Sequence, residues 1–531
     1  MKHLKTVASK FKPLIAAFII VGMAHAFLQS FTARYFQSVV DNFTGRSLTW
    51  AHIAIYGIAL FSLYVTGYLT EYPWRKLEHS IGLSLKTAAL RKLSVIDYLP
   101  YLKLGTGNLI QRIENGSAAG RNILFGFYLR LAGESLPTIF FSMVFVFTIN
   151  TTVMLSILLG YIIVFIISNL LLKALYKVKE RILVNEEKFN HFLVRGFMEM
   201  VVFRINRRFA REINKAEVAS KEIIASNVKM KMVHEAFFTI FAILIGFVKI
   251  GVIIYGWRAD ALTIGQIVAL VVLVDNAYQP IAIFNVLYVQ FKLDKIAFGR
   301  YTEFLDAQED TRLSHGQQVS CLKGHVKFSN VGFMYNEREI FKNLNLEIQQ
   351  GTSVAFVGES GAGKSTAVKL IAGLIKPTSG QITVDDVDLQ QVSLNSYYAH
   401  IAYLPQEPSI FNGTLRENLA FDEDVDPSLL MEAIKKVELY DLFTKLENGL
   451  DTQLGERGIS LSGGERQQLA LARLWFSDAN IVILDEATSA IDNQTQEAVM
   501  HNVMARLKGK TVIAIAHRLD SVRSFDRTIM F

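Results

Sequence analysis

The residues best suited to chemistry form a glycine-rich stretch in the second half of the chain. Their order over residues 358–365 is Gly-Glu-Ser-Gly-Ala-Gly-Lys-Ser, which matches the phosphate-binding loop G-x-x-x-x-G-K-[ST]. An apolar segment of β-type residues, 353–357, precedes this loop, and a helical pattern follows it. In this strand–loop–helix setting, backbone N–H groups and a helix N-terminus can bind a phosphate without Cβ clashes. The stretch therefore predicts a nucleoside triphosphate site, in which Lys364 reaches the β- and γ-phosphates and Ser365 holds Mg²⁺. The predicted site residues of this loop are Gly358, Glu359, Ser360, Gly361, Ala362, Gly363, Lys364, Ser365 and Thr366.

Two buried-strand patterns farther along the chain end in residues that could complete such a site. The run 481–484 is followed by Asp485 and Glu486. Because this class of site needs an acid at a strand end to organise Mg²⁺, Asp485 fits that position, and Glu486 is a candidate general base. The run 511–516 is followed by His517. A single histidine after a strand is usually structural, but this one shares the strand-end edge with the phosphate loop, which favours a γ-phosphate contact.

Tyr335 ends a predicted strand, 326–335, that precedes the phosphate loop. Its ring could stack on an adenine, an interaction worth about 1–3 kcal/mol. The alternative, an ordinary half-buried strand tyrosine, stays open at this point.

The composition divides the 531-residue chain, which is too long for a single core, into two halves. Hydrophobic residues make up 51% and charged residues 19%, and the apolar excess lies almost entirely before about residue 290. This distribution predicts a membrane half followed by a soluble half. Lysines beside membrane spans explain the net charge of +7, so we expect no nucleic-acid partner. The single cysteine, Cys321, excludes an intrachain disulfide framework, and no Cys/His spacing typical of a metal site occurs.

Six apolar runs follow a short basic amphipathic segment at residues 2–12, and each is close to the roughly 20 residues that cross a bilayer. These runs lie near 14–35, 52–72, 123–149, 152–176, 236–257 and 264–290. The first run could instead be a cleaved secretory signal, but it continues past the candidate cleavage site and five more runs follow. The lysine-rich start and the basic stretches 75–103 and 173–231 predict a cytoplasmic N-terminus. Six crossings then return the soluble half to the cytoplasm.

Three charged residues, Glu134, Lys249 and Asp275, fall inside these runs. Each costs about 2.5–3.5 kcal/mol at the middle of a bilayer, so we expect each to face a partner or a water-filled cavity. Two interpretations stay open: a structural ion pair that holds the helices together, and a lining of the transport path.

The segment Leu-Ser-Gly-Gly-Glu-Arg-Gln-Gln at 461–468 lies between the phosphate loop and Asp485, and this set resembles the nucleotide-binding domain of ABC transporters. Six spans, long cytosolic extensions and one C-terminal ATPase domain are similar to an exporter-type (type IV) half-transporter, so the resemblance covers nearly the whole chain. It implies a multidomain fold: an all-α six-helix transmembrane domain at 1–310, then an α/β P-loop ATPase domain with a helical subdomain at 322–531.

The resemblance implies roles for matching residues. These are adenine stacking by Tyr335, Mg²⁺ contacts from Ser365, Gln406 and Asp485, a general base at Glu486, a switch histidine at His517, an inter-subunit loop at Asp492, and contact with the opposite subunit's ATP by Ser462, Gly463, Gly464 and Glu465. Residues 452–458 resemble a segment found in exporters more than in importers. Coupling regions are expected near 100–115 and 195–215, although Gly116 stands where the family commonly has an aspartate.

The motif count predicts a second chain. One phosphate loop and one Ser-Gly-Gly-Glu turn, about a hundred residues apart, cannot enclose the same nucleotide, whereas a head-to-tail dimer gives each ATP one loop and one turn. The usual residue type stands at each catalytic position, which favours a homodimer and leaves a heterodimer open.

The resemblance implies ATP-driven export of an unidentified small molecule, lipid or peptide across a bacterial-type plasma membrane, with ATP and Mg²⁺ as cofactors. Two alternatives are an importer of a metal chelate with the same fold, and an ATP-gated channel or channel regulator. No peptidase domain precedes the first span, which argues against peptide export with leader cleavage. The chain ends at Phe531 inside an apolar run, and whether that end is native or a truncation is left open.

Overall fold

The structure is a computed structural model that describes the whole chain apart from residues 105, 260–261, 422–424, 456–460 and 517–523. The chain forms two compact units that do not follow a single boundary in the sequence. The helical unit consists of Met1–Lys92 and Thr106–Asp306, and the α/β unit consists of Leu93–Gly105 and Ala307–Phe531. The α/β unit therefore includes a short segment that lies, in sequence, between two helices of the helical unit.

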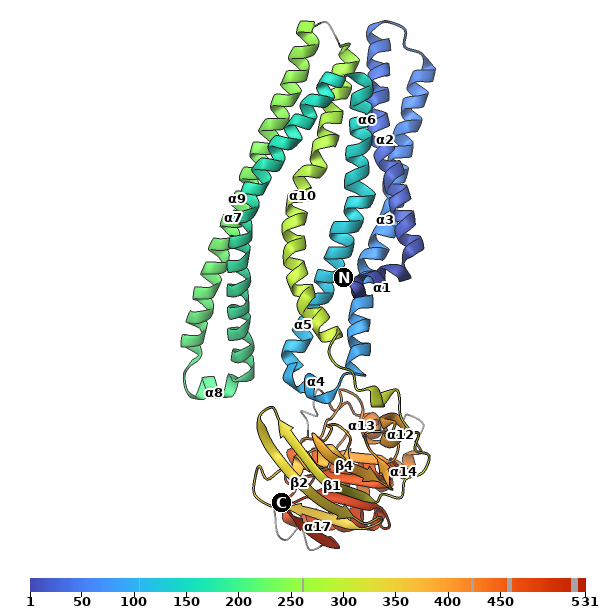
Figure 1. Cartoon of the computed structure of the whole chain (residues 1–531), viewed down its shortest axis with the longest axis vertical. Helices are drawn as coiled ribbons and strands as arrows, with labels where there is room; N and C mark the ends of the chain where they lie inside the picture. Colours follow the sequence, from blue (N-terminus) through green and yellow to red (C-terminus); the bar gives the residue numbers. More distant parts are fainter. Residues whose placement is uncertain (105, 260–261, 422–424, 456–460, 517–523) are drawn as a thin grey trace. The chain divides into compact units, whose positions relative to one another are not determined.

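Long helices make up the helical unit (Figure 1). They are α1 (Lys2–Lys10), α2 (Lys12–Thr44), α3 (Trp50–Leu93), α5 (Thr106–Arg121), η1 (Asn122–Leu129), η2 (Leu131–Ser135), α6 (Leu136–Ile149), α7 (Thr151–Met198), α8 (Met200–Ile205), α9 (Phe209–Ala259) and α10 (Ile264–Leu305). Among the described residues, five stretches are long and apolar enough to cross a membrane: Lys12–Thr44, Trp50–Leu93, Leu109–Ile149, Phe209–Arg258 and Ile264–Leu305. A shorter apolar stretch, Thr151–Val164, begins α7. Each predicted span lies within one of these stretches or within α7.

Two of the long helices begin at capping residues. Asn150 separates α6 from α7, and its side chain accepts a hydrogen bond from the backbone N–H of Val153. Thr263 begins α10 with a reciprocal capping box to Gln266. Each cap satisfies a helix N–H that would otherwise lack a partner.

The predicted span 123–149 is not one regular α-helix. Its first half is π-helical over η1 and η2, a rare conformation that often marks functional segments. This segment packs against α2, where a Cβ on Gly22 would collide with the carbonyl of Gly133. The two backbones therefore meet at a pair of glycines, a contact that the apolar pattern alone could not indicate.

Helices α7 and α9 run side by side and are joined through α8 (Figure 1). At the other end of this pair, a buried core connects them to α6 and α10. Its buried members are Ala33, Val146, Val153, Ile157, Val164, Phe237, Phe241, Val252, Leu270, Leu273, Val274, Tyr278 and Ala282. The pair is thus anchored to the rest of the unit through this core.

The α/β unit contains two sheets. An antiparallel sheet has the order β2 (Arg338–Ile348), β1 (Val326–Tyr335), β4 (Ser379–Val384), β5 (Val387–Asp388). A parallel sheet has the order β6 (Ile401–Leu404), β7 (Ile481–Asp485), β8 (Thr511–Ile515), β3 (Ser353–Val357), β9 (Arg527–Met530). In the parallel sheet the fully buried strands β7 and β8 read as continuous apolar runs, as expected for a sheet covered on both faces.

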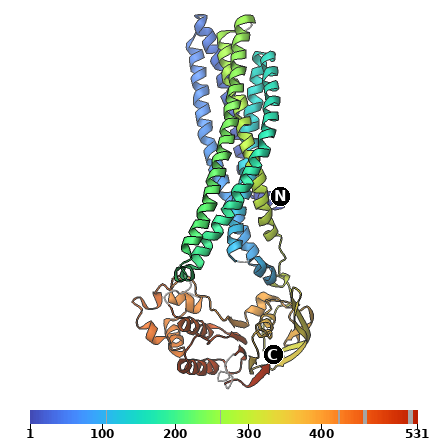
Figure 2. The same ribbon diagram turned by 90° about the vertical axis from the view of Figure 1, so that its left-hand side faces the viewer.

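Helices cover the sheets and form a separate group after β6. They are α4 (Tyr98–Leu104), η3 (Thr311–Leu313), α11 (Lys364–Ile371), α12 (Leu394–Tyr398), α13 (Leu415–Ala420), α14 (Pro427–Lys436), α15 (Tyr440–Phe443), η4 (Gly449–Asp451), α16 (Gly463–Ala472), η6 (Arg473–Phe476) and α17 (Asn493–Arg506). Figure 2 shows the antiparallel sheet, in yellow, at one side of the unit and the segment after β6, in orange, at the other. One buried core lies between the two sheets around α11, and a second joins β7 to α13, α14 and α16. The predicted architecture, a helical region followed by an α/β domain with a helical subdomain, is confirmed.

Candidate nucleotide-binding site

The glycine-rich loop joins β3 to α11, as the sequence predicted. Gly358, Gly361 and Gly363 have φ angles of +151°, +87° and +103°, a region that other residues rarely adopt. Lys364 is 5% exposed, and its Nζ donates to the carbonyl oxygens of Gly358 at 2.8 Å and Glu359 at 2.7 Å. The loop therefore curves around the lysine ammonium, and the N-terminus of α11 points into the same curve.

The three side chains predicted to hold Mg²⁺ belong to three different elements. Ser365 starts α11, Asp485 ends β7 and Gln406 follows β6. Asp485 is 6% exposed, while Ser365 and Gln406 are exposed. A hydroxyl, a carboxylate and an amide oxygen are hard donors that suit Mg²⁺, which usually takes few protein ligands beside the substrate's phosphates.

Glu486 has an unusual backbone conformation for a residue with a side chain, with φ at +51°. Such strain is found disproportionately at functional sites. Its carboxylate oxygen Oε2 accepts a hydrogen bond from Nε2 of Gln406 at 2.8 Å. The candidate base Glu486 and the candidate Mg²⁺ ligand Gln406 are therefore in direct contact, which the sequence did not indicate.

The Ser-Gly-Gly-Glu turn forms the N-terminus of α16. Ser462 Oγ accepts from the backbone N–H of Glu465 at 3.2 Å, and Glu465 Oε2 accepts from the N–H of Ser462 at 2.6 Å. This capping box rigidifies the turn and engages the Glu465 carboxylate. A Cβ on Gly464 would lie 3.0 Å from the carbonyl oxygen of Ala490, so Gly464 permits a close backbone approach there. Ser462 itself is exposed.

Gln467 connects this turn to the other candidate site residues. Its Nε2 donates to the carbonyls of Gln406 at 3.5 Å and Glu486 at 3.4 Å, and to Ser489 Oγ at 3.1 Å. Its Oε1 accepts from the backbone N–H of Ala490 at 2.8 Å. The sequence placed Gln467 in the 461–468 segment without a role. A glutamine on the apolar side of a short helix was the available signal, because a buried amide needs several partners.

The remaining predicted residues fall into three groups. Asp492 caps α17, and hydrogen bonds from the Thr495 backbone N–H hold the pKa of Asp492 below its ordinary value. Tyr335 is half-buried at the end of β1, with its ring 4.8 Å from that of Phe333, which fits both interpretations of this tyrosine. His517 lies outside the described residues, as do positions 456–458 of the segment 452–458.

The three charged residues of the predicted spans are all paired. Lys249 Nζ lies 2.6 Å from Asp275 Oδ2, which joins α9 to α10. Glu134 is paired with Arg130, one turn earlier, at 3.0 Å. All four side chains keep partial exposure, between 27% and 51%, so they are also accessible from the surface of the unit.

Residues 275–278 of α10 bind three other helices. Besides the ion pair of Asp275 with α9, Asn276 Oδ1 accepts from Gln29 Nε2 of α2 at 3.1 Å. Tyr278 Oη donates to the Ile157 carbonyl of α7 at 3.0 Å, and a tyrosine of α7, residue 161, donates to the carbonyl of residue 277 at 3.1 Å. Pro280 follows two residues later. It has no backbone N–H, so it cannot donate the helical hydrogen bond to the carbonyl of residue 276, four residues earlier. This segment therefore serves as a junction between helices.

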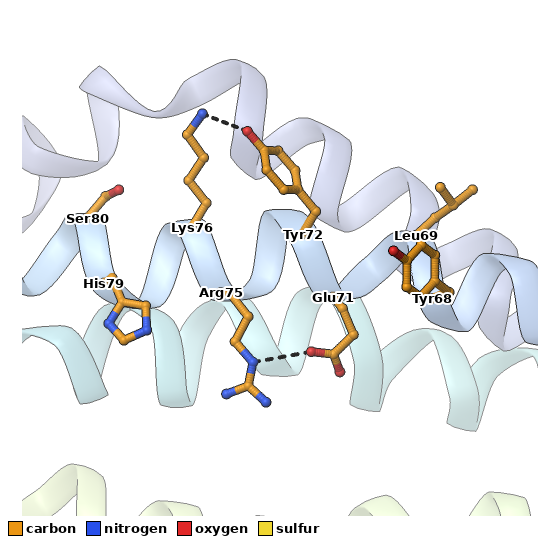
Figure 3. Close-up of a pocket in the computed structure, with 8 residues that line it drawn as sticks. All are labelled: Tyr68, Leu69, Glu71, Tyr72, Arg75, Lys76, His79 and Ser80. Atoms are coloured by element: carbon orange, nitrogen blue, oxygen red, sulfur yellow. Dashed lines mark hydrogen bonds and ion pairs between the residues drawn. The ribbon is translucent and has the colours of Figure 1, made fainter.

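One face of α3 is open and changes from aromatic to basic along its length (Figure 3). The side chains line a shallow cavity of about 720 Å³ and comprise Tyr68, Leu69, Glu71, Tyr72, Arg75, Lys76, His79 and Ser80. Lys76 Nζ donates to the hydroxyl of Tyr72 at 2.9 Å, and Arg75 pairs with Glu71 at 3.2 Å. Tyrosines followed by cations are typical of the boundary between a bilayer and the cytoplasm.

Comparisons with known proteins agree with this geometry. The family profile described as ABC transporter matches residues 341–489. The chain is 30% identical over 515 residues, 91% of its length and 85% of the relative's, to the uncharacterized ABC transporter ATP-binding protein YwjA of Bacillus subtilis. It is 29% identical to the ATP-dependent lipid A-core flippase of Alcanivorax borkumensis, over 69% of this chain and 64% of that protein.

A solved structure shares the fold of the chain. It is that of a bacterial Atm1-family ABC exporter with ATP bound, with a TM-score of 0.82 and 22% identity, over 98% of this chain and 93% of that one. The matched domain and the relatives confirm the predictions of ATP binding and of ATP hydrolysis coupled to transport through a multi-pass membrane protein. The chain therefore belongs to the ABC transporter family, with transmembrane helices and one ATPase domain fused in a single polypeptide that has the exporter fold.

Proposed function

We propose that the chain is an ATP-driven exporter that works as a homodimer in a bacterial-type plasma membrane. Each of two ATP molecules is bound between the phosphate loop of one subunit and the Ser462–Glu465 turn of the other. Closure of the two α/β units on ATP turns the helical units from inward-facing to outward-facing, and hydrolysis resets them. One relative is named a flippase and the solved neighbour an exporter, which supports transport out of the cytoplasm.

The observation that carries this proposal is that each half of a nucleotide site makes its hydrogen bonds within its own turn. Lys364 is bonded to the carbonyls of its own loop, and Ser462 is bonded to its own helix start. Within the described residues, no hydrogen bond joins residues 358–366 to residues 462–465. A helix N-terminus and a serine hydroxyl suit a phosphate, so the free turn fits the γ-phosphate of a nucleotide held by another copy.

Residues of one subunit would carry most of the chemistry. Ser365, Asp485 and Gln406 would hold Mg²⁺, which when bound neutralises charge on the phosphates. Glu486 would accept a proton from the attacking water, and the hydrogen bond from Gln406 would orient its carboxylate. Tyr335 would stack on the adenine, His517 would contact the γ-phosphate, and Asp492 would contact the other subunit.

Membrane placement follows from charge. The aromatic-to-basic face of α3 and the lysines of α1 favour a cytoplasmic N-terminus and a cytoplasmic α/β unit. Glu134, Lys249 and Asp275 are proposed to lie along the transport path, because partial exposure of paired charges in apolar helices fits a water-filled route. The cargo class, whether small molecule, lipid or peptide, is the part of the proposal that a screen of ATPase stimulation in lipid nanodiscs would define.

Mixed dimers test the shared site. We use Lys364→Ala to disable the phosphate loop and Ser462→Asp to place a negative charge where the phosphate would bind. Asp caps a helix as well as Ser does, so α16 should stay folded, and Ser462→Asn provides an uncharged control that should be impaired less. A dimer of one Lys364→Ala chain and one Ser462→Asp chain keeps one intact shared site. A dimer of one doubly substituted chain and one wild-type chain keeps none.

We expect ATP hydrolysis to survive in the first mixed dimer and to be lost in the second. The reverse result would mean that each nucleotide is bound within one subunit, and the proposed dimer mechanism would be wrong.

The direction of transport is tested separately with inside-out vesicles, where an exporter accumulates cargo against a gradient upon ATP addition. Release of preloaded cargo by ATP would indicate an importer, and flux that only follows the gradient would indicate a channel.

A further inference from the structure

The segment Leu93–Gly105 is held in the α/β unit by its own set of contacts. Ile96 pairs with Glu309 in an isolated β-bridge, and the N–H of Asp97 donates to the carbonyl of residue 308 at 3.0 Å. Asp97 is also 3.3 Å from Lys376 Nζ, just beyond α11. Lys376 in turn contacts Asp310, whose carboxylate is bonded by the buried guanidinium of residue 312. The helix α4 that follows Asp97 is thus anchored close to the end of the phosphate-loop helix.

Tyr98, the first residue of α4, lies among the rings of the nucleotide-binding core. It packs against the same buried core as Tyr335 and Tyr403. Tyr335 is the candidate adenine-stacking residue. Tyr403 belongs to strand β6, and the sequence pattern assigned it no role.

Tyr403 contacts Asp485, the carboxylate that is proposed to bind Mg²⁺. Its hydroxyl donates to Asp485 Oδ2 over 3.3 Å, across the β6–β7 pair. A tyrosine hydroxyl is protonated at neutral pH and a carboxylate only accepts, so the phenol serves as the donor. A hydrogen bond to one carboxylate oxygen restricts rotation of the group and so fixes the direction of its lone pairs.

We propose that Tyr403 is a positioning residue for the Mg²⁺ ligand Asp485 and that Tyr98 connects it to the segment between α3 and α5. Tyr98 and Tyr403 pack against one buried core, so displacement of Tyr98 with α4 acts through that core on Tyr403 and on the orientation of the Asp485 carboxylate. This route differs from the contact of Gln406 with Glu486, because it acts on the Asp485 carboxylate and not on the base. The inference rests on the proposed ATPase function and adds a specific connection to it.

Metal affinity tests the inference without relying on turnover. The full-length protein in nanodiscs is loaded with a non-hydrolysable ATP analogue, and Mn²⁺ binding is measured by electron paramagnetic resonance. Tyr403→Phe removes only the hydroxyl, and since loss of a partner of a metal ligand typically costs 10- to 100-fold in affinity, we expect the Mn²⁺ Kd to rise by about 10-fold. Affinity for the analogue without metal should be unchanged.

Tyr397→Phe is the matched control. Tyr397 is a fully buried tyrosine of the same unit whose hydroxyl donates to the Ile371 carbonyl at 2.8 Å, away from Asp485. It should leave the Mn²⁺ Kd at the wild-type value. An unchanged Kd in Tyr403→Phe, or an equal rise in both variants, would overturn the assignment of Tyr403.

The connection to α4 has its own comparison. Tyr98→Ala should raise the Mn²⁺ Kd, whereas Leu102→Ala, at an exposed position of the same helix, should not. If Tyr403→Phe does not fold, the comparison of Tyr98→Ala with Leu102→Ala still tests whether this core affects the Mn²⁺ Kd. Equal Kd values for the two variants would remove Tyr98 from the route. Failure of the wild-type protein to bind the analogue at all would instead contradict the proposed function.

Discussion

Polar residues act locally in the α/β unit and over long sequence separations in the helical unit. In the α/β unit, most candidate site residues come from short consecutive stretches: residues 358–366 lie on one turn and 462–465 on another, and each turn is stabilised by its own backbone. In the helical unit, polar residues act across long sequence separations, as with Gln29 and Asn276 or Lys249 and Asp275. Chemistry that a backbone turn provides can therefore be recognised in a sequence, whereas contacts between helices depend on how the helices pack.

The largest expected effect is on the ATPase rate, and it tests the local chemistry of the α/β unit by removing the carboxylate of Glu486. Glu486→Gln should lower the ATPase rate by about 10²–10⁴-fold, because a positioned general base is lost, while ATP binding is retained. The measurement is phosphate release by the protein in nanodiscs, with calorimetry for ATP binding. Glu497→Gln, at an exposed position of α17, is the control and should hydrolyse ATP normally. Near-normal turnover in Glu486→Gln would remove Glu486 from its proposed role.

A second prediction concerns helix packing at the junction of α7 and α10. A Cβ on Gly160 would collide with the hydroxyl of Tyr278, so Gly160→Ala must disrupt the bond from Tyr278 to Ile157. Overpacking of this kind costs about 1–3 kcal/mol, which we expect as a lower melting temperature in nanodiscs. Gly246→Ala is the matched control in α9, because nothing lies within 4 Å of a Cβ there. Adding Tyr278→Phe to Gly160→Ala should recover part of the loss, and no recovery would contradict the proposed clash.

The smallest expected effect comes from the ion pair of α9 and α10. A double-mutant cycle with Lys249→Met and Asp275→Asn should give a coupling of about 0.6 kcal/mol in stability, since polar contacts inside membrane proteins average that value and reach about 1.7. Thermal unfolding measures the coupling.

The same variants and Glu134→Gln also test the proposed transport path, through substrate-stimulated ATP hydrolysis and transport. Unchanged stimulation and transport in all three neutral replacements would leave these charges with a structural role alone.

Several features were predictable because they depend on local pattern. The strand 326–335 coincides with β1, and the run 353–357 coincides with β3. The strand β2 begins earlier than its apolar alternation indicates, because its first residues are polar and exposed. The spans followed from apolar length, which a bilayer requires of any crossing helix.

The sequence by itself identified the nucleotide-binding motifs and the positions of the apolar runs, because both depend on consecutive residues. Only the tertiary structure decided that 93–105 belongs with the α/β unit, that 122–135 is π-helical, and which partners the intramembrane charges have. It also decided that Tyr403 touches Asp485, a contact between neighbouring parallel strands far apart in sequence. The physical reason is that side-chain chemistry is fixed by residue type, whereas the distance between two side chains is set by packing of the whole unit.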